Sequence, residues 1–217
     1  MNRASHSIHE VISVREINST VFKVRLTRNN LEFKTGQHIN VGPASGGYTR
    51  EYSIYSGEND DYLEILVKEV LNGLVSPELH KLKKGNQVMV EPPLGYFYLP
   101  THDDKKMLFI ATGTGIAPYH SFIKTHPQLN YHLLHGVSEA SEACEKDFYK
   151  KENFTLCTSK KSDGDFHGRV TKWLNQNPID NYRHIYLCGN RNMINEVHSL
   201  LKQKSFPMEN IHAEAYF

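Results

Sequence analysis

The segment at residues 113–118, Gly-Thr-Gly-Ile-Ala-Pro, follows a short apolar run and precedes a helical pattern. Glycines at Gly113 and Gly115 let the backbone approach a ligand closely, and the free N–H groups of a new helix attract phosphate. The segment therefore predicts a site for the pyrophosphate of a nucleotide, although an ordinary strand-to-helix turn has the same residue types. Its spacing differs from G-x-G-x-x-G, so it does not indicate a Rossmann dinucleotide site.

The tetrapeptide at residues 50–53, Arg-Glu-Tyr-Ser, has the residue types that bind a flat and charged cofactor. In a strand, Arg50 and Tyr52 lie on one face, because successive side chains point to opposite sides. A guanidinium can bind phosphate through two parallel hydrogen bonds, and a tyrosine ring beside it can stack on a flat ligand. The alternative is an ordinary sheet with an exposed arginine and a half-buried tyrosine.

A third segment combines glycine with a helix start. Gly73 precedes Ser76, the predicted N-cap, and Pro77, the predicted first helical residue. A helix start preceded by glycine can bind an anion, and the alternative is a plain capped helix.

Two segments near the end of the chain give weaker signals. Cys188-Gly-Asn190 ends a predicted interior strand. Open α/β sheets bind ligands at such strand ends, but a buried cysteine is commonly structural. The chain ends in Tyr216 and Phe217, whose rings either cover a flat ligand or pack on the core.

Strand patterns fill residues 8–99. The stretches 7–17 and 20–26 alternate apolar and polar residues, and turn residues follow them. Several short strands with turns between them favour a closed barrel or a sandwich. Further strands are predicted near residues 37–42, 50–55, 62–70 and 87–91, with one helix from 77 to about 81.

The pattern changes after the polar stretch at residues 101–106, which we interpret as a linker. Short continuous apolar runs, typical of buried parallel strands, then alternate with helical patterns. This alternation predicts a doubly wound α/β domain. The strands are predicted at 107–111, 131–134, 154–157 and 184–188, and the helices near 117–124, 143–151, 169–176 and 191–203.

Composition excludes several classes of protein. The 217 residues carry a net charge of +1, which argues against a general nucleic-acid binder. There is no apolar run of membrane-spanning length and no signal-peptide pattern, so we expect a cytoplasmic protein. The three cysteines lack the spacing of a disulfide framework or an iron–sulfur cluster. His132 and His135 lie three apart in a predicted strand, on opposite faces, and we expect no metal site.

Taken together and in this order, the five motifs resemble the ferredoxin–NADP⁺ reductase family over essentially the whole chain. The stretches 63–77, 111–118 and 213–216 are most similar to its bacterial flavodoxin/ferredoxin reductase branch. The resemblance implies an antiparallel Greek-key β-barrel that binds FAD at residues 1–100. It also implies that the doubly wound α/β domain, at residues 101–217, binds NAD(P).

The resemblance assigns roles at the FAD. Arg50 would hold the FAD phosphates, Tyr52 would stack on one face of the isoalloxazine, and Ser53 would hydrogen-bond near flavin N5. The remaining FAD contacts would be Leu66 beside the flavin and Leu74, Val75 and Ser76 at the pyrophosphate.

The same resemblance places the nucleotide at Thr114, within the loop of Gly113 and Gly115, and near Gly189 and Asn190. Cys188 and Glu214 would border the contact between nicotinamide and flavin, and Tyr216 would cover the other flavin face until the nicotinamide displaces it. With Ser53, these three residues form the expected catalytic set. Phe217 extends past Tyr216 and is the alternative stacking ring.

Selectivity for the nucleotide rests on two loops. Where the bacterial branch often carries an arginine for the 2′-phosphate, this chain has Ser138 followed by Glu139, and an acidic residue suits NADH. Against that, Ser159, Lys160 and Arg169 match in position the residues that hold the 2′-phosphate in that branch. We therefore expect NADPH, with NADH as the alternative.

The resemblance implies an oxidoreductase that moves a hydride between NADPH and flavin N5, then exchanges single electrons with a ferredoxin or flavodoxin. The absence of a cluster-forming cysteine set makes any iron–sulfur partner a separate chain. The alternatives are an NADH-linked reductase component of an oxygenase system and a non-catalytic nucleotide-binding regulatory module.

Overall fold

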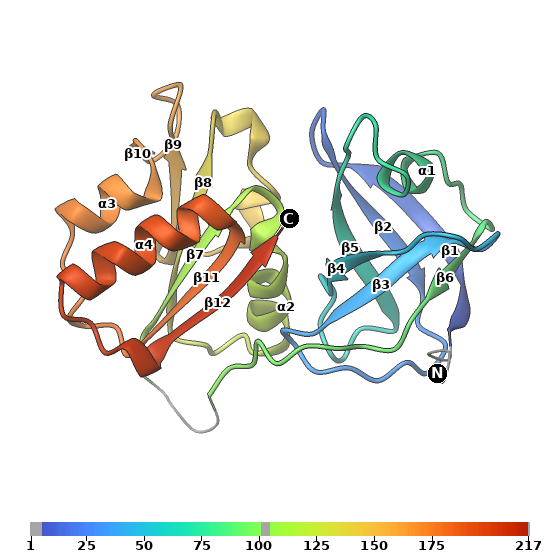
Figure 1. Cartoon of the computed structure of the whole chain (residues 1–217), viewed down its shortest axis with the longest axis horizontal. Helices are drawn as coiled ribbons and strands as arrows, with labels where there is room; N and C mark the ends of the chain where they lie inside the picture. Colours follow the sequence, from blue (N-terminus) through green and yellow to red (C-terminus); the bar gives the residue numbers. More distant parts are fainter. Residues whose placement is uncertain (1–5, 101–104, 217) are drawn as a thin grey trace. The chain divides into compact units, whose positions relative to one another are not determined.

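The computed structural model describes residues 6–100 and 105–216 and divides the chain into two compact units (Figure 1). The first unit holds the chain up to Leu99 together with Ala117–Pro127, and the second holds Pro100–Ile116 and the chain from Gln128 onward. Most of the predicted linker and Phe217 lie outside the described residues. The domain boundary expected between residues 100 and 101 stays a proposal.

The first unit is an antiparallel sheet of six strands that curls into a nearly closed barrel, as predicted (Figure 1). A bridge between Ile54 and Ile65 brings the two edge strands of the sheet, β4 and β5, together. Alternate side chains of the strands, such as Leu63, Ile65 and Val67, fill the barrel core. The strands are β1 (Ser7–Glu16), β2 (Val21–Thr27), β3 (His38–Pro43), β4 (Arg50–Ser53), β5 (Tyr62–Lys68) and β6 (Gln87–Val90).

Helix α1 (Ser76–His80) begins one residue earlier than predicted. Val75 is its N-cap, so the prediction of Ser76 as the cap is wrong. The Ser76 hydroxyl instead accepts a hydrogen bond from the Val70 N–H at 3.0 Å, across the preceding loop. The Ser76 hydroxyl therefore stabilises the loop and does not cap the helix. The sequence pattern around the helix start could not show this contact.

The second unit contains a six-stranded parallel sheet in the order β10-β9-β8-β7-β11-β12, which confirms the doubly wound prediction. The order reverses between β7 and β11, and ligands of such sheets bind at the carboxyl ends of the strands flanking that point. The strands are β7 (Met107–Thr112), β8 (Tyr131–Val137), β9 (Phe154–Thr158), β10 (Phe166–His167), β11 (His184–Asn190) and β12 (Ile211–Tyr216).

Helices α3 (Val170–Gln176) and α4 (Arg191–Gln203) pack through Leu174 and Val197 against one face of this sheet (Figure 1). Helix α2 (Ala117–Thr125) groups instead with the first unit. Among the described residues, no helix has the length and apolar character needed to cross a membrane.

The helix predicted at residues 143–151 is wrong, because the segment forms 3₁₀ turns joined by extended residues. Glu145 adopts a left-handed conformation with φ 44°, and Tyr149 is extended. Cys144 and Tyr149 are both buried, although two residues five apart do not share one face of a helix. Within the described residues, the 3₁₀ turns are η1 (Gly113–Ile116), η2 (Ala140–Glu142), η3 (Lys146–Phe148), η4 (Lys151–Asn153) and η5 (Met208–Asn210).

Candidate functional site

Strand β4 carries three of the predicted FAD residues, and their exposure to solvent decreases along the strand. Arg50 is exposed, and its guanidinium donates to the Thr49 carbonyl at 2.9 Å. Tyr52 is half-buried and Ser53 is buried. Burial raises the pKa of Tyr52 to about 12, opposed by the positive charge of Arg50. The ring is therefore a neutral phenol near pH 7, which suits stacking on a flat aromatic group.

The loop between β5 and α1 is held together by hydrogen bonds between its two ends. Besides the Ser76 contact, Gly73 N–H donates to the Val70 carbonyl at 2.7 Å. Leu74 is 55% exposed, whereas Val75 is buried in the barrel core and offers only its backbone. Leu66 is also buried, on β5. The turn thus leaves the Leu74 side chain exposed, at the place where the FAD pyrophosphate is expected.

The nucleotide loop packs tightly at the switch point between β7 and β11. A Cβ atom at Gly115 would lie 2.3 Å from the Cys188 carbonyl oxygen, and one at Gly189 would lie 2.5 Å from the Thr112 hydroxyl. Gly189 has φ +124° and Gly113 has φ +52°, which favour glycine. A Cβ at Gly113 would meet open space. The loop is thus packed on one side and open on the other, as a ligand cradle requires.

Cys188, Glu214 and Tyr216 come together across two paired strands, with Cys188 opposite Glu214 and Asn190 opposite Tyr216. Burial, and then the charge of Glu214, raise the pKa of the Cys188 thiol well above its usual value. A hydrogen bond from Tyr216 opposes that rise without reversing it. Cys188 is therefore a neutral thiol that can contact a ligand but is a poor nucleophile.

The loops after β8 and β9 lie side by side. Ser159 N–H donates to the Val137 carbonyl at 3.1 Å, and Lys160 N–H to the Ser138 carbonyl at 2.9 Å. The ammonium of Lys161 pairs with the Glu139 carboxylate. Lys160 is exposed, and within residues 6–100 and 105–216 no carboxylate pairs with it.

Two more of the predicted nucleotide residues contact other groups of the protein. Arg169 precedes α3, with its guanidinium 3.9 Å from the Glu196 carboxylate, and both side chains are largely exposed. Asn190 caps α4, since its side-chain oxygen accepts from the Asn192 N–H at 2.9 Å. An asparagine directly before a helical pattern was a usable signal for that cap.

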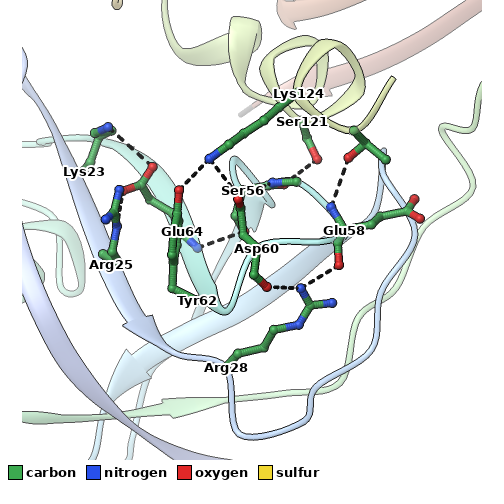
Figure 2. Close-up of polar contacts among 12 residues, drawn as sticks. Lys23, Arg25, Arg28, Ser56, Glu58, Asp60, Tyr62, Glu64, Ser121 and Lys124 are labelled. Carbon is green, nitrogen blue, oxygen red and sulfur yellow. Dashed lines mark hydrogen bonds and ion pairs between the residues drawn. The ribbon is translucent and has the colours of Figure 1, made fainter. Parts of the chain in front are cut away.

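Sequence reasoning missed the attachment of α2 to the barrel (Figure 2). The Ser121 hydroxyl donates to the Ser56 carbonyl at 2.6 Å, and the Lys124 ammonium lies 2.7 Å from the Asp60 carboxylate. One helical turn before Lys124, the His120 ring stacks on Tyr55 with centroids 3.8 Å apart. These contacts hold the segment that follows Ser53, so α2 supports one end of the predicted flavin strand.

Further charged side chains lie beside these contacts (Figure 2). Glu64, which is buried, accepts from Arg25 at 3.0 Å and pairs with Lys23 at 3.4 Å. Arg28 donates to the Glu58 carbonyl at 2.7 Å. The residues involved are far apart in sequence, so no local motif could reveal this network.

Buried histidines should make the fold sensitive to acid. Burial lowers the pKa values of His132 and His135 to about 4, from an ordinary value of 6.5, and that of His120 is also well below it. As pH falls from about 6.5 towards 4, the unfolded chain binds more protons than the native one, so the free energy of unfolding should fall. Melting temperatures across this range measure the effect. His132→Gln should flatten the slope, and exposed His198→Gln should not; a flat wild-type profile would contradict the burial argument.

No three histidine, cysteine or carboxylate side chains of the described ranges gather as metal ligands.

The chain is similar to two family models. Residues 7–98 match the oxidoreductase FAD-binding domain and residues 109–199 the oxidoreductase NAD-binding domain.

Two curated relatives extend this similarity. A ferredoxin–NADP reductase of Pseudomonas aeruginosa is 36% identical over 153 residues, covering 65% of this chain and 58% of that protein. A toluate 1,2-dioxygenase electron transfer component of Pseudomonas putida is 27% identical over 230 residues, covering 95% of this chain and 66% of that protein. The matched regions thus span less than two thirds of either relative.

Among solved structures, a ferredoxin NADP⁺ reductase from Neisseria gonorrhoeae, with bound FAD and NADP, aligns with a TM-score of 0.89. The alignment covers 99% of this chain and 100% of that one at 21% identity. At this identity the likeness establishes the two-domain fold.

Proposed function

Because the chain belongs to the ferredoxin–NADP reductase family of oxidoreductases, with an FAD-binding domain before an NAD-binding domain, we propose that it passes electrons between NADPH and a small redox protein, a ferredoxin or a flavodoxin. The observation that carries the proposal is strand β4, where an exposed guanidinium, a half-buried neutral phenol and a buried hydroxyl follow one another. These groups fit a phosphate, a flat ring and a polar ring atom in that order.

When bound, FAD supplies the hydride acceptor for the nicotinamide and the one-electron exchange with the redox protein. The chain's own residues bind and orient. Arg50 neutralises phosphate charge, Tyr52 packs flat on one face of the flavin, and Ser53 hydrogen-bonds at N5. Leu74, Val75 and Ser76 would present donors to the pyrophosphate, and Leu66 would lie beside the flavin.

On the nucleotide side, the loop at residues 113–115 receives the pyrophosphate and the Gly189–Asn190 turn lies beside the nicotinamide. Cys188 and Glu214 would border the contact between nicotinamide and flavin. Tyr216 covers the flavin until the nicotinamide takes its place. No side chain acts as a nucleophile in this scheme, in keeping with the high pKa of the Cys188 thiol.

We assign NADPH as the preferred nucleotide on the basis of charge. The Glu139 carboxylate, which would suit the ribose hydroxyl of NADH, is paired with Lys161. Lys160 and Arg169 are exposed cations near the same strand ends, with Ser159 between the strand and Lys160. An exposed ammonium and an exposed guanidinium favour a dianionic 2′-phosphate.

A second candidate is an NADH-linked reductase component of an oxygenase system. It is favoured by the similarity of 95% of the chain to the toluate 1,2-dioxygenase component. Turnover with candidate partners separates the two functions. The FAD-loaded chain should reduce a ferredoxin or a flavodoxin with NADPH as electron donor; reduction of neither, with rapid NADH oxidation by an oxygenase partner, would favour the second candidate. Inability to reduce any acceptor would favour a non-catalytic nucleotide-binding module.

Removing the terminal ring should strengthen nucleotide binding. If Tyr216 stacks on the flavin, the nicotinamide must displace it, and an aromatic pair contributes about 0.5–1.5 kcal/mol beyond burial. Deleting Tyr216 and Phe217 should therefore tighten NADP⁺ binding by about 2- to 10-fold and slow product release. Tyr216→Phe, which keeps a ring, is the control. An unchanged NADP⁺ affinity with a lower melting temperature would mean that the residues only anchor the chain end.

A further inference from the structure

His135 lies in β8, fully buried, at the level of the nucleotide loop. Its Nε2 atom is 2.9 Å from the carbonyl oxygen of Gly113, the first residue of that loop. A carbonyl oxygen only accepts hydrogen bonds, so Nε2 carries the hydrogen and donates it. Burial lowers the pKa of His135 to about 4, so the ring is neutral near pH 7 and its Nδ1 is a bare acceptor.

The Nδ1 atom has no hydrogen-bond partner. Within residues 6–100 and 105–216, every other buried side-chain nitrogen or oxygen has one. A buried acceptor without a partner is destabilising, because it has lost its hydrogen bonds to water. Such an atom in a native structure calls for an explanation other than stability.

His132, in the same strand, makes a useful comparison. Its Nε2 lies 2.9 Å from the Thr155 hydroxyl, its ring stacks near Trp173, and its pKa is also about 4. The two pKa values are therefore alike, although His132 is only half-buried and His135 is fully buried. What distinguishes His135 is the hydrogen bond to the loop and the unpartnered nitrogen.

That hydrogen bond fixes a peptide that glycine would otherwise leave free. The structure contains no cis peptide among the described residues, and in a trans peptide the C=O and the following N–H point in opposite directions. With the Gly113 carbonyl turned to His135, the Thr114 N–H points away from it. Gly113, at φ +52°, could accept either orientation of this peptide, because it lacks a side chain.

We propose that His135 is a positioning residue for the nucleotide: its Nε2–H holds the Gly113 carbonyl and so directs the Thr114 N–H outward, to a phosphate of the dinucleotide. The other end of the loop is already fixed by the packing of Gly115 on the Cys188 carbonyl. The imidazole thus completes a loop held at both ends. This inference rests on the proposed nucleotide role of residues 113–115.

The test uses the full FAD-loaded chain and NADP⁺ as the probe, with binding measured by calorimetry. His135→Leu should weaken NADP⁺ binding about tenfold, the scale of one hydrogen bond to a charged group, with the visible spectrum of FAD unchanged. In turnover, KM for NADPH should rise more than kcat falls. His135→Gln, whose amide can still donate, should restore most of the affinity.

His132→Leu is the matched control, because it removes a half-buried imidazole with a similarly lowered pKa from the same strand. It should leave NADP⁺ affinity unchanged. Equal weakening by both leucine variants, or wild-type affinity in His135→Leu, would overturn the proposal. A wild-type chain that fails to bind NADP⁺ at all would instead overturn the proposed function on which the inference rests.

A measurement on the unmutated protein covers the case in which His135→Leu does not fold. Nitrogen-15 NMR of the histidine rings should find His135 in the Nε2–H tautomer, and its resonance should shift on adding NADP⁺. The Nδ1–H tautomer, or a resonance indifferent to NADP⁺, would contradict the proposal.

Discussion

Replacing Arg50 with alanine is expected to strip FAD from the barrel while leaving the barrel folded. Arg50 is exposed on β4 and takes no part in the buried core, so its loss should hardly change the free energy of unfolding. Charge-assisted hydrogen bonds contribute about 1.5–3 kcal/mol each, which corresponds to about a 10- to 150-fold loss of FAD affinity for one bond. FAD affinity, measured by flavin fluorescence on the stripped protein, checks this.

Two variants sharpen that experiment. Arg50→Lys keeps the charge but loses the two-pronged geometry, so FAD affinity should fall to an intermediate value. Arg15→Ala removes another exposed arginine from the same barrel and should leave FAD affinity unchanged. Wild-type FAD affinity in Arg50→Ala would remove this residue from the cofactor site.

The second large effect is expected on nucleotide selectivity. Replacing Lys160 and Arg169 together by alanine should raise KM for NADPH by about 10- to 150-fold, the scale of one charge-assisted hydrogen bond to the 2′-phosphate. KM for NADH should stay the same, because NADH has no 2′-phosphate. The kcat with NADPH should change less than KM, since the lost interaction is present in both ground and transition states.

The matched control is the double variant Lys150→Ala with Lys151→Ala, which removes the same charge from two exposed lysines of the same unit. It separates a local contact from a general loss of positive charge. Equal losses for NADPH and NADH in the Lys160 and Arg169 variant would mean that these residues do not recognise the phosphate.

The sequence predicted those elements whose signals are local. Helix α4 begins and ends at the predicted residues 191 and 203, because its apolar stripe and its preceding asparagine both lie within the segment. The buried parallel strands β7 and β8 were found for the same reason. The strand β12 was missed, because it is an edge strand that gains its conformation from pairing with β11.

In the candidate site, too, the local features could be predicted and the long-range contacts could not. The glycines at 113 and 115 and the tetrapeptide at residues 50–53 are contiguous motifs, so composition and spacing indicated them. The partner of the Gly113 carbonyl is 22 residues away, and Ser121 and Ser56 are 65 residues apart. Such contacts depend on the packing of the whole unit, which a single sequence without a fold does not reveal.

The most direct test of the central claim is an anaerobic titration of the FAD-loaded protein with NADPH, followed by the visible absorbance of the flavin. We predict stoichiometric bleaching of that absorbance, faster with NADPH than with NADH at equal concentration. A flavin that stays oxidised at saturating NADPH and NADH, in protein shown by calorimetry to bind the nucleotide, would contradict the assignment as a reductase.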